Sequence, residues 1–175
     1  LQAGEAEAAG ALLTQLCADR CAALPWDQLW LGALVALAEV AVAINDRVAA
    51  TLLYELLLPF AARNVMVGVP ISLGAAALYV AQLAECRSES AAAEQQYEHA
   101  IAFHTRLAMR AMLARTQVAY AAFLRRARQP ERAAALLHAA QAAVDPTEQP
   151  VLAAEIAGLL ASEMVSTPSF GLTER

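Results

Sequence analysis

The chain has 175 residues, which is long enough for one domain with a substantial core, and 59% of them are apolar against 7 Gly and 7 Pro. Ala accounts for 45 residues and is the best helix former, whereas the β-branched and aromatic residues that favour strands are sparse, so an all-α fold is predicted. All 12 basic residues are Arg and the net charge is −5, which argues against direct nucleic-acid binding by the domain as a whole.

The chain is expected to lie in the cytoplasm. It opens at Leu1 without an initiator Met and without a basic stretch before an apolar one, which predicts no signal peptide and indicates a segment of a longer polypeptide. The longest apolar run, Leu29–Ile44, contains Glu39 and is shorter than the ~18–20 residues that span a bilayer. The three cysteines are unevenly spaced and form no disulfide framework, so reduced thiols are expected.

Periodicity and turn residues predict eight helices joined by short connections. In chain order they cover residues 5–23, 25–44, 47–63, 72–86, 90–107, 110–126, 130–145 and 150–164. Leu24-Pro25 and Asn45-Asp46 separate the first three helices, and Pro59 is expected to kink or shorten the third. Asn64–Pro70 is predicted to be the one real loop. Residues 1–164 are expected to form a single helical domain, and residues 165–175 a flexible tail.

Short connections make each helix antiparallel to the next, which fits either a bundle or a solenoid. An internal repeat favours the solenoid. The repeated pattern consists of a small residue, a large residue four positions later, and a small or apolar residue three positions after that. These offsets place all three residues on one face of a helix. The pattern occurs as Ala9–Leu13–Leu16, Ala50–Tyr54–Leu57, Ala93–Tyr97–Ala100 and Ala133–Leu137–Ala140. These four units are 41, 43 and 40 residues apart, and Leu37-Ala38, Val80-Ala81 and Tyr120-Ala121 precede three of them at a nearly constant offset.

This pattern resembles the tetratricopeptide repeat, with a period longer than the usual ~34 residues. Ala stands where that motif prefers Gly, and the motif's Trp and final Pro are missing. The resemblance implies a right-handed α-solenoid of about four antiparallel helical hairpins. The last helix is a plausible cap for the open end of such a solenoid. Uncovered apolar positions on it, such as Ile156, would allow self-association into a homo-oligomer.

A second resemblance covers residues 24–144. It rests on the segments Leu24–Asp27, Trp30-Leu31, Leu53–Ala61, Asn64-Val65 and Ala114–Gln117. These are similar to the helical repeat region of large bacterial multidomain regulators, in which an NTPase module accompanies a LuxR-type DNA-binding domain or a nucleotide-cyclase domain. The resemblance implies a regulatory scaffold without catalysis in this segment.

The sequence contains no phosphate-binding loop, no zinc-ligand spacing and no Glu-x-x-His motif, so no catalytic residue, metal or cofactor is predicted. Cys17 and Cys21 are spaced as two ligands could be, but buried thiols are the simpler interpretation. His99 and His104 face different sides of one helix, and each is interpreted as a packed or solvated residue. Trp26 and Trp30 are expected to cover the seam to the first helix or an interface with a preceding domain of a longer chain.

Charge is distributed unevenly along the chain. Residues 1–100 carry 4 Arg and 11 acids, whereas residues 106–132 carry 7 Arg and one acid. A charge run is often only a solvated face, and Arg near a helix C-terminus also complements the helix dipole. The functional interpretation is a groove that is acidic to neutral at one end and basic at the other.

In tetratricopeptide proteins the first helix of each hairpin lines the concave groove. Counting back from each signature Ala, that resemblance assigns to the groove Glu39, Gln82, Glu85, Arg115, Val118, Arg125 and Arg126. Three convergent guanidinium groups at the basic end of the groove suit a carboxylate or a phosphate. The expected partner is therefore an acidic peptide or the acidic surface of a protein domain, which can belong to the same full-length chain. The predicted function is a non-catalytic interaction or signal-relay scaffold. The alternative is a domain that senses a small-molecule effector.

Overall fold

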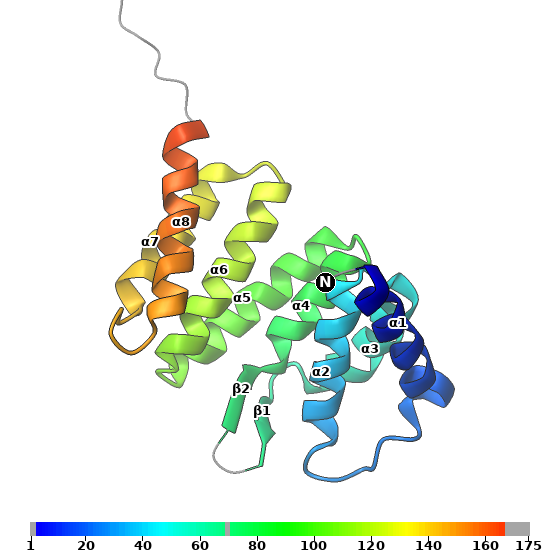
Figure 1. Ribbon diagram of the computed structural model, residues 1–175. Helices are drawn as coiled ribbons and strands as arrows, with labels where there is room; N and C mark the ends of the chain where they lie inside the picture. The colour runs from blue at the N-terminus through cyan, green and yellow to red at the C-terminus, as the bar shows by residue number, and fades with distance from the viewer. Residues whose placement is uncertain (1–2, 69–70, 167–175) are drawn as a thin grey trace, which may run out of the picture. The chain divides into compact units, whose positions relative to one another are not determined.

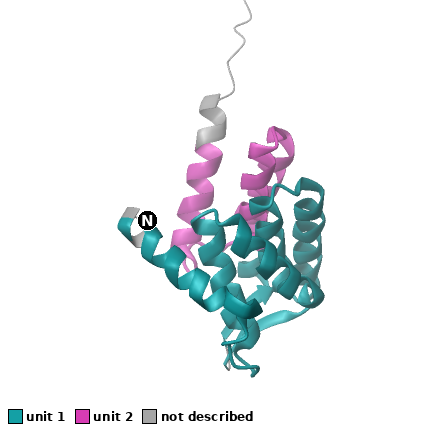
Figure 2. Cartoon of the chain, turned by 90° about the vertical axis from the view of Figure 1, so that its right-hand side faces the viewer, with its two compact units in different colours: residues 1–112 teal, residues 113–175 magenta. Residues whose placement is uncertain are grey.

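The computed structural model describes residues 3–68 and 71–166. Over these residues it contains eight α-helices and one small two-stranded sheet (Figure 1). The chain is therefore mostly helical, as its composition predicts, although the composition gives no indication of the sheet. It forms two compact units, Leu1–Met112 and Leu113–Arg175 (Figure 2).

The first unit contains α1 (Ala3–Cys17), the 3-10 turn η1 (Ala18–Cys21), α2 (Trp30–Ala43), α3 (Arg47–Leu57), the 3-10 turn η2 (Leu58–Phe60), β1 (Asn64–Val67), β2 (Ile71–Ala75), α4 (Ala76–Cys86) and α5 (Ser90–Arg106). The unit boundary falls in the first turn of α6 (Arg110–Arg126), which is followed by α7 (Pro130–Ala143) and α8 (Pro150–Ser166).

The predicted helices from residue 90 onward agree with α5 to α8 to within two residues, and those before it are shorter than predicted. The first ends at Cys17 because Asp19, Arg20 and Cys21 have φ angles of 47°, 58° and 61°, which no right-handed helix accommodates. The second begins only at Trp30, and the third changes at Leu58 into a 3-10 turn containing Pro59.

The predicted loop at Asn64–Pro70 is wrong, because its first four residues form β1, which pairs antiparallel with β2. The fourth helix consequently begins at Ala76 and not at Ser72. The register Val65↔Gly74 and Met66↔Ser72 leaves Leu73 as an extra residue, and Gly74 beside it has a φ of 85°. The carbonyl of Leu73 accepts a hydrogen bond of 2.9 Å from the Tyr79 hydroxyl.

The turns that end α4, α5 and α6 share one geometry. Each contains a residue of positive φ that is not glycine, namely Ser88, Ala108 and Arg128, at intervals of 20 residues. In each turn the next amide reaches back to the carbonyl five residues earlier, as from Met109 to His104 at 2.9 Å. A helix of 17 residues and a turn of three give this interval in α5 and α6. Two such helices account for the 40-residue spacing between the third and fourth units of the sequence repeat.

Most of the positions that define the sequence repeat lie in the core. Ala50, Ala93 and Ala133 are fully buried, and so are the Tyr97 and Leu137 side chains near them. Ala9, Leu16 and Tyr54 are only half-buried. Small residues in these positions let adjacent helices approach closely.

A hydrogen bond connects the start of α3 to the end of α4. Arg47 at the start of α3 donates to the carbonyl of Cys86, at the end of α4, over 3.1 Å.

Helix α4 is the most enclosed element of the first unit. Nine of its eleven residues are buried, and it packs against α2, α3 and α5. Its N-cap residue is Ala75, whose side chain cannot accept a hydrogen bond from the backbone. Three other acceptors serve its first amides. They are His104 Nε2 for Ala75 at 2.8 Å, the Arg63 carbonyl for Ala76 at 3.0 Å and the Ala61 carbonyl for Ala77 at 3.1 Å.

The β-hairpin is packed between helices of the first unit at two glycines. A Cβ on Gly32 of α2 would lie 2.7 Å from Val67 Cγ2, and one on Gly74 would lie 2.6 Å from His104 Nε2 and 2.8 Å from Met112 Cε. These distances are shorter than a carbon atom tolerates. Because Gly32 and Gly74 have no side chain, β1 can lie against α2 and β2 can lie against α5.

In the second unit, Arg132 of α7 donates to the Tyr120 hydroxyl of α6 at 2.9 Å, and α7 packs against α8. Ile156 on α8 is fully buried, so the expectation that it stays uncovered is wrong. Val151 at the start of that helix is 81% exposed.

The predicted tail lies, from residue 167 onward, outside the described residues. No helix within the described ranges is both long enough and apolar enough to cross a bilayer.

The two glycines of the hairpin that have positive φ provide a matched test of its packing. Gly68 has a φ of 62° and open space around it, so Gly68→Ala should cost about 1 kcal/mol of unfolding free energy from backbone strain alone. Gly74→Ala adds a collision with His104 and should cost about 2–4 kcal/mol. Urea denaturation of both variants measures the difference, and equal losses would contradict this packing.

Candidate functional site

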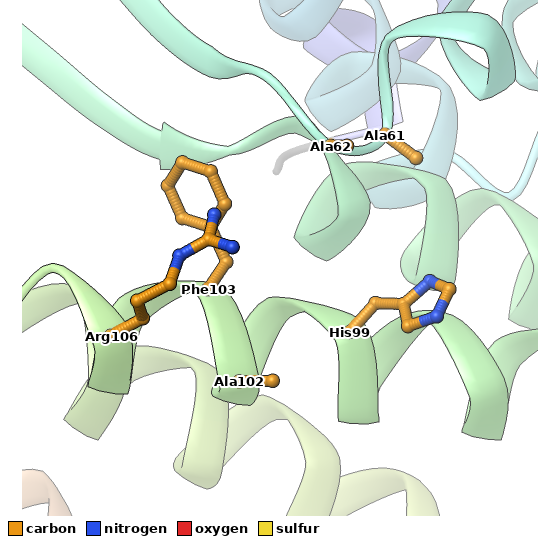
Figure 3. A pocket seen from close by; sticks show the side chains of 6 residues that line it. All are labelled: Ala61, Ala62, His99, Ala102, Phe103 and Arg106. Carbon is orange, nitrogen blue, oxygen red and sulfur yellow. The ribbon is translucent and has the colours of Figure 1, made fainter.

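A cavity of about 320 Å³ opens on the surface of the first unit. Four of its lining residues, His99, Ala102, Phe103 and Arg106, follow one another on α5 at the spacing of a single helix face. Ala61 and Ala62, in the turn after η2, face them from the other side (Figure 3). The cavity therefore has one wall with polar side chains on a helix and one small, apolar wall on a turn.

The helical wall combines a cation with an aromatic ring. The Arg106 guanidinium lies 5.5 Å from the centroid of the half-buried Phe103 ring, and in Figure 3 it lies in front of that ring, toward Ala62. This stacking limits the motion of the guanidinium while its N–H groups stay available at the edge. His99 is exposed, and its imidazole lies at the other end of the helical wall from Arg106 (Figure 3). None of the described residues that line the cavity is acidic, so it is suited to an anion.

The apolar wall is fixed by the buried amino end of α4. The Ala77 amide donates to the Ala61 carbonyl and the Ala76 amide to the Arg63 carbonyl, so the turn carrying Ala61 and Ala62 is held against the helix. The Ala75 amide donates in the same way to His104, the residue that follows Phe103 on α5. One set of hydrogen bonds therefore joins both walls of the cavity.

His104 is fully buried, and its desolvation lowers the pKa of the imidazole below its ordinary value. Acceptance of the Ala75 amide at Nε2 requires that nitrogen to be unprotonated, so the neutral ring carries its proton on Nδ1. Of the two histidines on α5, His104 is thus the packed residue and His99 the solvated one.

The groove residues predicted in the first unit differ in accessibility. Glu39 on α2 is exposed, whereas Gln82 and Glu85 on α4 are half-buried. Glu85 also accepts a hydrogen bond from the hydroxyl of the buried Tyr97, so it belongs to the packing of α4 on α5.

In the second unit, α6 exposes Arg115, Arg125 and Arg126, whereas Val118 is only 8% exposed and belongs to the packed interior. Arg115 and Arg126 lie eleven residues apart, which places them within about 20° of each other around the helix and about 16 Å apart along it. They cannot converge on one small carboxylate. They mark instead the two ends of an extended surface.

The cysteines are packed side chains. Cys21 and Cys86 are buried, and burial together with the neighbouring Cys21 raises the pKa of the half-buried Cys17 thiol to about 12, so this thiol is uncharged at neutral pH. Among the described residues, no three His, Cys, Asp or Glu side chains group closely enough to hold a metal ion.

The exposure of the aromatic residues near the start of α2 bears on one of the two predictions for them. Trp30 meets Trp26 at a centroid distance of 4.1 Å and Phe60, at the end of η2, at 5.6 Å. Trp26 is 77% exposed, so it does not cover the seam to the first helix.

The chain matches no protein-family model, no curated protein and no solved structure. Its function is therefore inferred from the cavity beside α5 and from the arginine-bearing side of α6.

The buried His104 predicts how stability depends on pH. Because its pKa is lower in the folded chain than in the unfolded one, folding is favoured by the neutral ring. The contribution of the neutral His104 ring to the free energy of unfolding is complete above about pH 6.5. It is lost as the pH falls from that value toward the pKa in the folded chain, and the loss is at most about 1.4 kcal/mol per pH unit.

The comparison variant is His104→Gln, which keeps an oxygen acceptor for the Ala75 amide and cannot be protonated. Denaturant unfolding of both proteins between pH 7 and 5 should show the wild type losing stability relative to the variant. Parallel curves would show that the proton on His104 does not affect folding.

Proposed function

We propose that this chain is a non-catalytic binding scaffold, built from helical hairpins, that engages an acidic segment of a partner protein along α6. The single observation that carries the proposal is the exposed side of α6. This helix bears four Arg and no acid, and three of those four Arg are exposed in the second unit.

The exposed side of α6 has the composition of a docking surface for another helix. Between Arg115 and Arg126 lie the half-exposed Ala119 and Ala122, which share their helix face. Alanines at the centre allow a partner backbone to approach closely, and an arginine at each end binds carboxylates. We infer an acidic helix as partner, with carboxylates about three turns apart.

Within the scaffold we propose a right-handed solenoid of about four hairpins, related to tetratricopeptide repeats. The recurring turn, the buried alanines and the packing of α4 on α2, α3 and α5 support this arrangement. Solenoids of this kind present long surfaces to peptides and protein domains. We further propose that the chain acts in the cytoplasm as part of a larger bacterial regulator, and that it relays a signal without catalysing a reaction.

A second candidate function is the sensing of a small-molecule effector. The observation that favours it is the cavity between α5 and the turn after η2, whose volume of about 320 Å³ falls within the range of small-ligand sites.

The docking surface is tested with a synthetic acidic helical peptide that carries two glutamates eleven residues apart. Titration followed by NMR of the labelled chain should shift the amides of α6. Arg115→Glu combined with Arg126→Glu should weaken binding about tenfold or more, because two attractive charges become repulsive.

The matched control for this titration is Arg63→Glu, which makes the same kind of charge reversal at an exposed position of the first unit and should leave peptide affinity unchanged. Circular dichroism establishes that each variant keeps its helices. Undiminished binding by the folded double variant would refute the proposal.

A further inference from the structure

The cavity beside α5 is not explained by a scaffold that binds along α6. Its six lining residues all belong to the first unit, whereas the Arg115–Arg126 surface belongs to the second. An inference about its ligand therefore rests on the effector-sensing candidate and is independent of the docking surface.

The charge of the cavity determines the charge of its ligand. Arg106 is positive at every physiological pH, no acidic residue is among the six, and the exposed imidazole of His99 adds a second N–H donor. Arg106 and His99 are seven residues apart, or about 10 Å along the helix. An anionic group on Arg106 therefore leaves His99 to contact a different end of the same ligand.

The lining between these two residues determines the shape of the ligand. It consists of the Phe103 ring and the methyl groups of Ala61, Ala62 and Ala102, none of which offers a side-chain hydrogen bond. Methyl groups and a ring favour a flat apolar body over a sugar or a polyphosphate. The volume of about 320 Å³ equals that of roughly ten water molecules in the liquid, which accommodates about a dozen non-hydrogen atoms of a ligand.

We propose that this cavity is a binding site for a small organic acid with a flat apolar body. The carboxylate binds the Arg106 guanidinium, which Phe103 holds in place, and the body lies across Ala102 against the wall formed by Ala61 and Ala62. His99 donates to a polar group at the far end where the acid has one.

Both walls of the cavity are held in place by hydrogen bonds that do not involve a ligand. Ala61 is fixed by the Ala77 amide, and α5 is fixed beside Phe103 by the bond between Ala75 and His104. The cavity is therefore formed before the ligand arrives, which reduces the ordering cost of binding.

The probe that tests the site is 3-phenylpropionate, compared with its uncharged amide, 3-phenylpropanamide, and with acetate. Titration of the labelled chain at millimolar concentrations should shift the amides around Ala102 and Phe103 and around Ala61 in a saturable way, with a dissociation constant on the order of 1 mM. The amide should bind about tenfold more weakly because it lacks the charge, and acetate should not saturate because it lacks the apolar body.

Two substitutions at exposed positions locate the binding site. Arg106→Gln should weaken 3-phenylpropionate about tenfold by removing the charge, and Ala102→Leu should abolish binding by filling the cavity. Arg128→Gln removes the same charge from an exposed position outside the cavity lining and should leave the affinity for 3-phenylpropionate unchanged.

Absence of saturable shifts, equal binding of acid and amide, or unchanged affinity in Arg106→Gln would each overturn the proposal. These outcomes leave the acidic-peptide titration unaffected, since that titration reports on Arg115 and Arg126. Failure of the cavity as an effector site is thus distinguishable from failure of α6 as a docking surface.

Discussion

The arrangement of the first unit depends on which groups accept hydrogen bonds from the amino end of a buried helix. The first amides of any helix have no acceptor within the helix, and inside a core they cannot donate to water. Helix α4 and its N-cap begin with three alanines, which offer no side-chain acceptor for this purpose. The amides instead bind two carbonyls of the turn after η2, those of Ala61 and Arg63, and the imidazole of His104. Because these acceptors come from two distant parts of the chain, satisfying one helix fixes the positions of its neighbours.

The same constraint shapes the candidate site. The turn after η2 and the end of α5 are brought together because both supply acceptors to the amino end of α4, and the cavity lies between them. The hairpin between α3 and α4 lets the chain reach this point, and glycine at position 74 is what allows it to pass beside His104. Backbone chemistry thus positions a surface feature: residues that no binding motif connects become the two walls of one cavity.

The long helices can be predicted from the sequence better than the short β-hairpin. Helices α5 to α8 are predicted to within two residues because long helices and a recurring turn give a strong periodic signal. Burial of Ala50, Ala93 and Ala133 follows from the same signal. The hairpin escapes prediction because its strands have only four and five residues and are stabilised by a contact between residues 29 apart, Ala75 and His104.

The candidate surfaces are predictable only in part. The sequence predicts exposed arginines on α6, but the rise of the helix separates Arg115 from Arg126 too far for one carboxylate. On α5, the spacing from His99 to Arg106 indicates one helix face, but no signal in the sequence places Ala61 and Ala62 opposite it, because the hydrogen bonds that bring them there are made by backbone groups.

The capping of α4 by His104 is tested most directly by NMR of the histidine side chains in the ¹⁵N-labelled chain. The structure predicts that His104 carries its proton on Nδ1 and that a scalar coupling across the hydrogen bond connects the Ala75 amide to Nε2. The capping of α4 by His104 would be contradicted if Nε2 carried a proton at neutral pH. It would also be contradicted if the Ala75 amide showed no such coupling and exchanged its hydrogen with solvent as fast as an exposed amide.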